Sequence, residues 1–225
     1  MRAVKISVVV PVLNEERNLS RLTASMRSVI EQGHEVIIVD GGSTDNTLSL
    51  AYEISDKVVV SKKGRAIQMN SGASVASGDI ILFLHADTCL PDDVSEIISK
   101  AFVDNGFWGG FDVRLSNNKL VYRLIEYMMN TRSRLTSIVT GDQAIFVEKN
   151  LFEKIGGFPE IALMEDVEIS RRLKNISRPV RLKHNVVTSS RRWERNGVVS
   201  TILLMWKLRL FYFFGVSPEK LSQMY

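Results

Sequence analysis

Two side chains with metal- and phosphate-binding chemistry, His85 and Asp87, stand directly after an unbroken apolar run at residues 80–84. Five apolar residues in a row predict a short strand that is buried on both faces. This strand would end on an imidazole and a carboxylate two positions apart. One carboxylate is enough for Mg²⁺ or Mn²⁺ where phosphate and water oxygens complete the ligand shell.

A second carboxylate, Asp40, ends another predicted strand at 34–40 and is followed by a polar, glycine-containing turn at 41–47. Ligands of parallel sheets bind beyond the carboxyl ends of the strands. Topology therefore predicts that Asp40 and Asp87 lie at one mouth. The alternative for Asp40 is a carboxylate that caps its own turn.

Strand and helix signals alternate through the first half of the chain. This alternation predicts an α/β fold with a doubly wound, mostly parallel sheet. The predicted strands are 6–13, 34–40, 57–61 and 80–84, and the predicted helices are 14–30, 46–55, 65–77 and one that begins near Pro91.

The second half is less regular, and we expect it to be mixed, with a helical tail at the C-terminal end. The predicted elements are a strand at 106–115 entered through a tight glycine turn, a helix at 120–135, a strand and a helix within 141–159, a loop entering a helix at 163–174 and a strand at 181–190.

Length and cysteine content suit one intracellular domain. A chain of 225 residues fits a single medium-sized domain. The single cysteine, Cys89, excludes an internal disulfide, suits a reducing cytosol and is expected to be a buried thiol. The apolar N-terminal run lacks a small-residue cleavage site, so we expect a strand there and not a signal peptide.

Positive charge is concentrated toward the C-terminal end. Residues 168–225 carry 12 Lys and Arg against 3 Asp and Glu, whereas residues 1–167 carry 17 against 22. A basic end predicts an anionic partner, such as a diphosphate or an acidic membrane, or else a solvated basic face. The acidic remainder and the lack of a recognised motif argue against nucleic acid.

The segment 198–216 holds 14 apolar residues in 19 and is interrupted by Lys207 and Arg209. These central charges argue against a membrane-spanning helix. Three alternatives stay open: an interfacial helix on an anionic membrane, a helix in a homodimer interface, and a helix that packs on its own domain.

Five segments follow one another along the chain: "VVVPVLNEERNL", "IIVDGGSTDNT", "GRAIQMNSGASVASGDIILFLHADT", "TGDQAIFV" and "LMEDVEIS". Their order and spacing resemble those of family 2 glycosyltransferases with the GT-A fold, over nearly the whole chain. Within that family the chain is similar to short, soluble members associated with arsenosugar biosynthesis.

The resemblance implies one GT-A domain over residues 1–225. Its parts would be a nucleotide-binding half at 1–90, an acceptor-side half at 91–190, and a basic lid with an apolar helical tail at 191–225. The implied reaction is an inverting, metal-dependent transfer of a sugar from a nucleotide diphosphate, expected to be UDP, to a hydroxyl acceptor in the cytoplasm.

Two rival functions remain. A nucleotidyltransferase would carry a glycine-rich loop after the first strand, and "PVLNEERN" contains no glycine. A catalytically impaired nucleotide-sugar-binding or membrane-recruitment module is favoured by His85, which stands where the family motif has an acid. Asp87 and Asp166 argue against this second rival.

The implied nucleotide-binding residues surround the mouth of the first half. Asp40 corresponds to the acid that hydrogen-bonds the base or ribose, and Arg65 is the first choice for the diphosphate. Glu15 could equally be a charge at a helix N-terminus. The full set is Pro11, Leu13, Glu15, Asp40, Arg65 and His85.

The resemblance also implies a metal ligand and a catalytic base. Asp87 corresponds to the last acid of an Asp-x-Asp motif, which would bind Mn²⁺ or Mg²⁺. For His85 the alternatives are substrate contact, metal ligation and a structural role. Asp166 is favoured over Glu165 as the base that deprotonates the acceptor, and the alternative is a pair of acids stabilised by a helix N-terminus.

Three further segments resemble the sugar and acceptor site. Gly109 and Gly110 would let backbone approach a ligand closely, and Asp142 and Gln143 would bind sugar hydroxyls. In the basic segment 189–197 the implied contacts are diphosphate at Arg191 and Arg192 and acceptor at Trp193, once the segment closes as a lid. The alternative is a basic surface loop anchored by its tryptophan.

Overall fold

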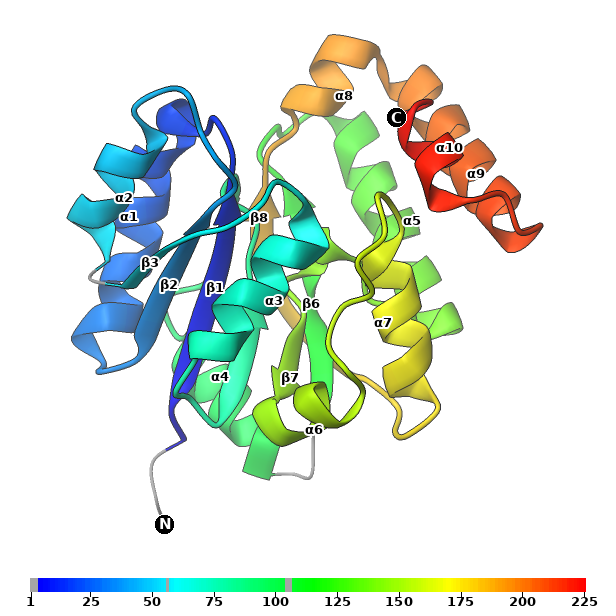
Figure 1. Ribbon diagram of the computed structural model, residues 1–225. Helices are drawn as coiled ribbons and strands as arrows, with labels where there is room; N and C mark the ends of the chain where they lie inside the picture. The colour runs from blue at the N-terminus through cyan, green and yellow to red at the C-terminus, as the bar shows by residue number, and fades with distance from the viewer. Residues whose placement is uncertain (1–3, 56, 104–106) are drawn as a thin grey trace.

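Four parallel strands in the N-terminal half end at one edge of a sheet (Figure 1). The computed structural model describes residues 4–55, 57–103 and 107–225. These strands have the order β3-β2-β1-β4. A predicted helix joins each consecutive pair of strands along the chain, and the helix near Pro91 follows them. The elements are β1 (Ile6–Val12), α1 (Glu16–Glu31), β2 (Glu35–Asp40), α2 (Thr47–Ile54), β3 (Lys57–Val60), α3 (Arg65–Val75), β4 (Ile80–Phe83) and α4 (Val94–Val103).

Four more strands extend the sheet and make it mixed. β7 is antiparallel to β4 and β6, β8 is parallel to β6, and β5 is antiparallel to β8. The sheet order is therefore β3-β2-β1-β4-β7-β6-β8-β5, which confirms the predicted mixed second half. The added strands are β5 (Thr88–Cys89), β6 (Trp108–Leu115), β7 (Phe146–Glu148) and β8 (Val180–Thr188).

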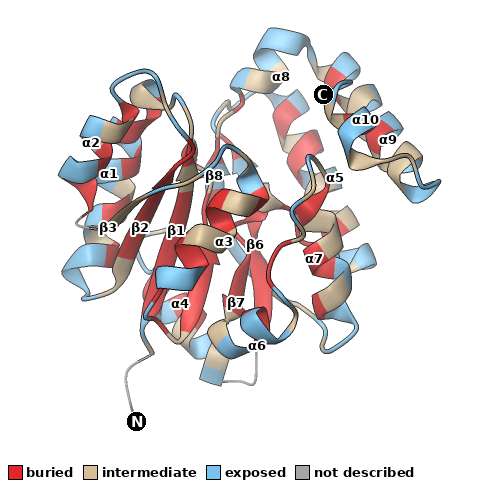
Figure 2. Cartoon of the chain, in the orientation of Figure 1, coloured by how far each residue is buried: buried red, intermediate tan, exposed pale blue. Residues whose placement is uncertain are grey.

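Alternation along β1 produces two packed layers. Val8 and Val10 pack in the cluster that contains side chains of α1 and α4. Val9 packs in the cluster with side chains of α3, α6 (Lys149–Lys154) and α7 (Glu165–Lys174). Both faces of the central strands are therefore buried (Figure 2). Polar side chains can reach solvent only where such a strand ends.

The remaining helices follow β6 in the chain, and the last three of them form its C-terminal part. Figure 1 shows α8, α9 and α10 grouped together beyond the sheet. Residues 191–196 form a helix and not a loop, and Gly106, at the start of the predicted 106–115 strand, lies outside the described residues. The helices are α5 (Leu120–Thr136), the 3-10 helix η1 (Gly141–Gln143), α6 (Lys149–Lys154), α7 (Glu165–Lys174), α8 (Arg191–Asn196), α9 (Val198–Phe213) and α10 (Pro218–Ser222).

The apolar tail folds as α9, which packs only in part on its own domain. Thr201 and Leu208 are its buried residues, and Leu208 contacts the cluster that contains Met164 and Leu221. Among the described residues, no helix combines the length and the apolar character needed to cross a membrane. Cys89, expected to be buried, is half-buried in β5.

Gly109 and Gly110 are buried where β6 meets its neighbours. A Cβ atom on Gly109 would lie 2.1 Å from the carbonyl oxygen of Val180 in β8. A Cβ atom on Gly110 would lie 2.4 Å from Cγ1 of Val139. The close approach that these glycines permit is to protein, so the geometry gives no support for ligand contact at Gly109 and Gly110.

Gly109→Ala should lower the free energy of unfolding by about 1–3 kcal/mol, because the added methyl group forces β6 away from β8. Urea denaturation measures this loss. An unchanged urea midpoint would contradict the close approach of the two strands.

Candidate active site

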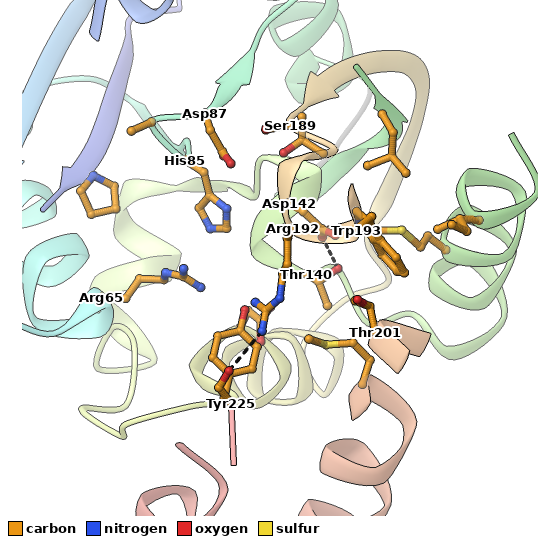
Figure 3. Close-up of a pocket in the computed structure, with 18 of the residues that line it drawn as sticks. Arg65, His85, Asp87, Thr140, Asp142, Ser189, Arg192, Trp193, Thr201 and Tyr225 are labelled. Atoms are coloured by element: carbon orange, nitrogen blue, oxygen red, sulfur yellow. Dashed lines mark hydrogen bonds between the residues drawn. The ribbon is translucent and has the colours of Figure 1, made fainter. Parts of the chain in front are cut away.

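One cavity of about 790 Å³ lies beyond the ends of β1 and β4 and extends to α5 and α9. Figure 3 shows Arg65, His85 and Asp87 on one side, Trp193 and Thr201 on the other, and Arg192 between them. The predicted residues that line it are Pro11, Leu13, Glu15, Arg65, His85, Asp87, Asp142, Asp166, Arg192 and Trp193. Those that do not line it are Asp40, Gly109, Gly110, Gln143, Glu165 and Arg191.

Polar contacts fasten the loop after β1 to the loop after β2. The N–H of Asn14 donates to Oγ of Ser43 at 2.9 Å, and Oδ1 of Asn14 accepts the N–H of Thr44 at 2.8 Å. The N–H of Glu15 donates to Oγ1 of Thr47 at 2.8 Å. Glu15 also lies immediately before α1 and lines the cavity, so both of its predicted roles fit this position.

Asp40 faces its own turn. Its side chain is buried, and Oδ2 accepts the N–H groups of Gly42 at 2.9 Å and Ser43 at 3.0 Å. This is the turn-capping alternative, and the geometry gives no support for direct contact with a nucleotide. Asp40 instead positions the loop at the edge of the cavity.

Arg65, the first residue of α3, reaches across the cavity wall to Glu165 of α7. Its Nη1 atom lies 3.5 Å from Oε1 of Glu165. Glu165 is buried, and burial together with the neighbouring Asp166 raises the pKa of its carboxyl, an effect that Arg65 opposes. Arg65 is about half exposed and therefore keeps N–H groups for an anion.

His85 forms a neutral part of the cavity wall. Burial, with a smaller effect of the Arg65 charge, lowers the pKa of its imidazole to about 3. Its buried Nε2 atom has no hydrogen-bond partner among the described residues. The ring packs on Gly141, where a Cβ atom would lie 2.5 Å from Nε2. His85 therefore has a structural contact and also borders the space where a ligand would bind.

Asp87 provides a single carboxylate in the turn between β4 and β5. Burial raises the pKa of this carboxyl, and Arg191 is the strongest of the groups that lower it. Among the described residues, no group of three or more His, Cys, Asp and Glu side chains could hold a metal alone. The donor set fits a hard cation only if a phosphate-bearing substrate and water supply the other oxygens.

Asp166 lies in the first turn of α7 and faces the cavity. Oδ2 accepts the N–H of Gly141 at 3.0 Å, and Oδ1 accepts the N–H of Val167 at 2.7 Å. Glu165, in contrast, is buried and paired with Arg65. Of these two acids, Asp166 is the one that lines the cavity.

Of the two predicted residues in the η1 helix, one lines the cavity and the other does not. Asp142 lines the cavity and accepts a hydrogen bond from Oγ1 of Thr140 at 2.5 Å. Gln143 is fully buried: it accepts the N–H of Thr140 at 3.2 Å and donates to the Phe111 carbonyl at 3.3 Å. Its amide completes a local cap, so the geometry gives no support for direct contact between Gln143 and a sugar.

The basic helix α8 presents two of its predicted residues to the cavity. Trp193 and Arg192 line it, and the Arg192 guanidinium stacks 3.6 Å from the ring centre of Tyr225. Arg191 lies outside the cavity lining, and its charge acts on Asp87.

Two cavity arginines, Arg132 and Arg209, were missed by the sequence reasoning. Arg132 donates to Oγ1 of Thr140 at 3.2 Å, and burial, with a smaller effect of Arg209, lowers the pKa of Arg132 to about 10. It stays charged at neutral pH. Both arginines lie in segments that the apolar pattern predicts to be helical, so neither was recognised as a candidate site residue. Their helical spacing from inward-facing apolar residues was a usable signal.

Comparison with known sequences identifies the family. Residues 7–156 match the family described as glycosyl transferase family 2. The chain belongs to this family. Asp166 lies beyond the matched residues, so its assignment depends on geometry.

Relatives and solved structures agree on the fold. The probable glycosyltransferase YdaM of Bacillus subtilis is 26% identical over 231 residues, which cover 91% of this chain and 53% of YdaM. The chain thus spans about half of that relative's length. Residues 1–349 of Staphylococcus aureus TarS align with 20% identity and a TM-score of 0.67, covering 83% of this chain and 60% of that structure.

The mannosyltransferase PcManGT from Pyrobaculum calidifontis, in complex with GDP-Man and Mn²⁺, aligns with a TM-score of 0.63 and 19% identity. The alignment covers 83% of this chain and 57% of that structure. The family 2 glycosyltransferase has the GT-A fold expected from its sequence.

A double-mutant cycle of Arg65→Gln and Glu165→Gln should show coupling of about 0.5–1 kcal/mol, because one partner of the ion pair is partly exposed. The free energies of unfolding in urea give the coupling. Strictly additive single-variant effects would contradict an ion pair between α3 and α7.

Proposed function

We propose that the chain transfers a sugar from a nucleotide diphosphate donor to a hydroxyl acceptor. One observation carries the proposal: a single cavity joins a strand-end carboxylate, Asp87, several cationic groups, and a carboxylate at a helix N-terminus, Asp166. A transferase needs these functions to bind the diphosphate, stabilise its developing charge and deprotonate the acceptor.

The proposed donor lies between α3 and α8. Arg65, Lys63 and Arg192 line this part of the cavity and suit a diphosphate. TarS has been crystallised with UDP-GlcNAc, whereas PcManGT was crystallised with GDP-Man, so these neighbours bind different bases. UDP is our proposal for this chain.

Asp87 is the proposed ligand of Mn²⁺ or Mg²⁺, with His85 beside it as a neutral donor to the ribose or phosphate. When bound, such an ion neutralises charge on the leaving diphosphate. A structure of glucosyl-3-phosphoglycerate synthase from Mycobacterium tuberculosis contains Mg²⁺ and UDP, which supports the pairing of metal and donor.

Asp166 is the proposed base of an inverting transfer. The amides of Gly141 and Val167 orient its carboxylate at the cavity wall. It would take the proton of the acceptor hydroxyl as that oxygen attacks the anomeric carbon on the side opposite the diphosphate. Asp142 is placed to bind a sugar hydroxyl nearby.

We also propose a cytoplasmic location, with peripheral contact to an anionic membrane or to a second copy through residues 198–216. The exposed apolar side chains of α9 support such contact, and the single cysteine suits a reducing compartment.

UDP with Mn²⁺ should raise the melting temperature more than either ligand alone. At a ligand concentration of about 100 times Kd the stabilisation is about 2.7 kcal/mol, which corresponds to several degrees for a domain of this size. Differential scanning fluorimetry measures it. The absence of a shift with any nucleotide would reject the donor site.

Asp166→Asn should keep UDP binding and lose about 10²- to 10⁴-fold in kcat, because the amide cannot accept the proton. A transfer assay across nucleotide sugars supplies the rates. Glu165→Gln is the matched control for Asp166→Asn, because the neighbouring Glu165 does not line the cavity. Unimpaired transfer by Asp166→Asn would remove Asp166 as the base. Nucleotide binding without transfer by the unmodified chain would favour the impaired-module alternative.

A further inference from the structure

The cavity has an apolar half that the proposed donor leaves empty. Its walls are two helix faces: α5 contributes Ile125, Met128 and Met129, and α9 contributes Ile202, Met205 and Trp206. On each helix these positions recur at intervals of three or four residues, so each helix presents one apolar stripe to the same space. We call this space the α5–α9 groove.

On each helix an arginine side chain follows the apolar stripe by one turn. Arg132 follows Met128 by four residues and Arg209 follows Met205 by four residues, and both arginines line the cavity. The charges of Asp142 and Asp166 oppose the lowering of the Arg132 pKa by burial, so this end of the groove lies near the proposed base.

The groove offers little to a wholly polar ligand. The Thr201 hydroxyl at its wall already donates to the Gly197 carbonyl at 2.7 Å. Apolar side chains outside the groove are also exposed on both helices, because Leu124 of α5 and Leu203 of α9 are each 59% exposed. Monomeric proteins rarely expose continuous apolar surface of this kind without a ligand or a partner.

We infer that the α5–α9 groove binds the apolar chain of an amphiphilic acceptor whose hydroxyl-bearing head lies at Asp166; this inference rests on the proposed function. Flexible methionine side chains suit a chain without fixed shape. The position of the groove commits it to the acceptor, because the nucleotide-binding side chains line the opposite end of the same cavity (Figure 3).

The transfer then has one balanced step. The acceptor hydroxyl oxygen forms a bond to the anomeric carbon, and the bond from that carbon to the diphosphate oxygen breaks. The nucleoside diphosphate leaves with the bonding electron pair, and the hydroxyl proton passes to Asp166.

Tryptophan fluorescence reports binding in the groove directly. Trp193 and Trp206 line the cavity, whereas Trp108 is buried in β6. The probe is a set of alkyl β-glucosides that carry bromine at the end of the chain, used below their micelle concentration. Quenching should saturate, and the Kd obtained from it should fall about threefold to fourfold for each added methylene group. Affinity that is independent of chain length would overturn the inference.

Two neighbouring positions on α5 provide a matched pair. Met128 lines the groove, and Tyr127 is 69% exposed and does not. Met128→Glu should weaken probe binding at least tenfold, and Tyr127→Glu should leave it unchanged. Circular dichroism confirms that both variants are folded. Equal effects of the two substitutions would overturn the inference, as would a stable dimer in which the groove is closed to the probe.

The same samples separate this inference from the proposed function. If UDP with Mn²⁺ raises the melting temperature but chain length has no effect on quenching, the donor site stands and the acceptor groove is rejected. If the probe binds with the predicted chain dependence but no nucleotide binds, the groove stands and the transferase proposal fails.

Discussion

Burial of β1 and β4 on both faces is the constraint on which the site depends. A strand of this kind cannot carry charged groups along its length without a large desolvation cost, so the chain places them where the strand ends. Parallel pairing of β4 with β1 then brings Asp87 and His85 to the same edge as the loop that contains Glu15. The backbone topology thus places the ionisable groups of the cavity at one edge of the sheet.

The second half of the site is joined to the first through Gly141. Its N–H donates to Asp166, while its α-carbon leaves just enough space for the His85 ring. The Arg65–Glu165 pair makes a parallel connection from α3 to the turn of α7 that also carries Asp166. The proposed donor side and the proposed base are therefore positioned by shared contacts.

Apolar periodicity and strand-end acids are local signals, and they predict the first-half elements and their parallel arrangement. They miss β5, which has only two residues and no periodicity. The family resemblance implies ligand contacts for Asp40 and Gln143, yet the hydrogen-bonding groups of both side chains are used by nearby backbone groups. The helical spacing of Arg132 and Arg209 from apolar residues was visible in the sequence, but the arrangement of α5 and α9 around one cavity was not.

The sparse burial of α9 has a dynamic consequence. With only Thr201 and Leu208 buried, this helix has less packing free energy than the sheet and should open locally far below the global unfolding limit. One wall of the cavity is consequently compliant, while the opposite wall, built on β1 and β4, is rigid. Such a cavity can hold the groups on β1 and β4 in fixed positions while the α9 wall moves to fit ligands of different length.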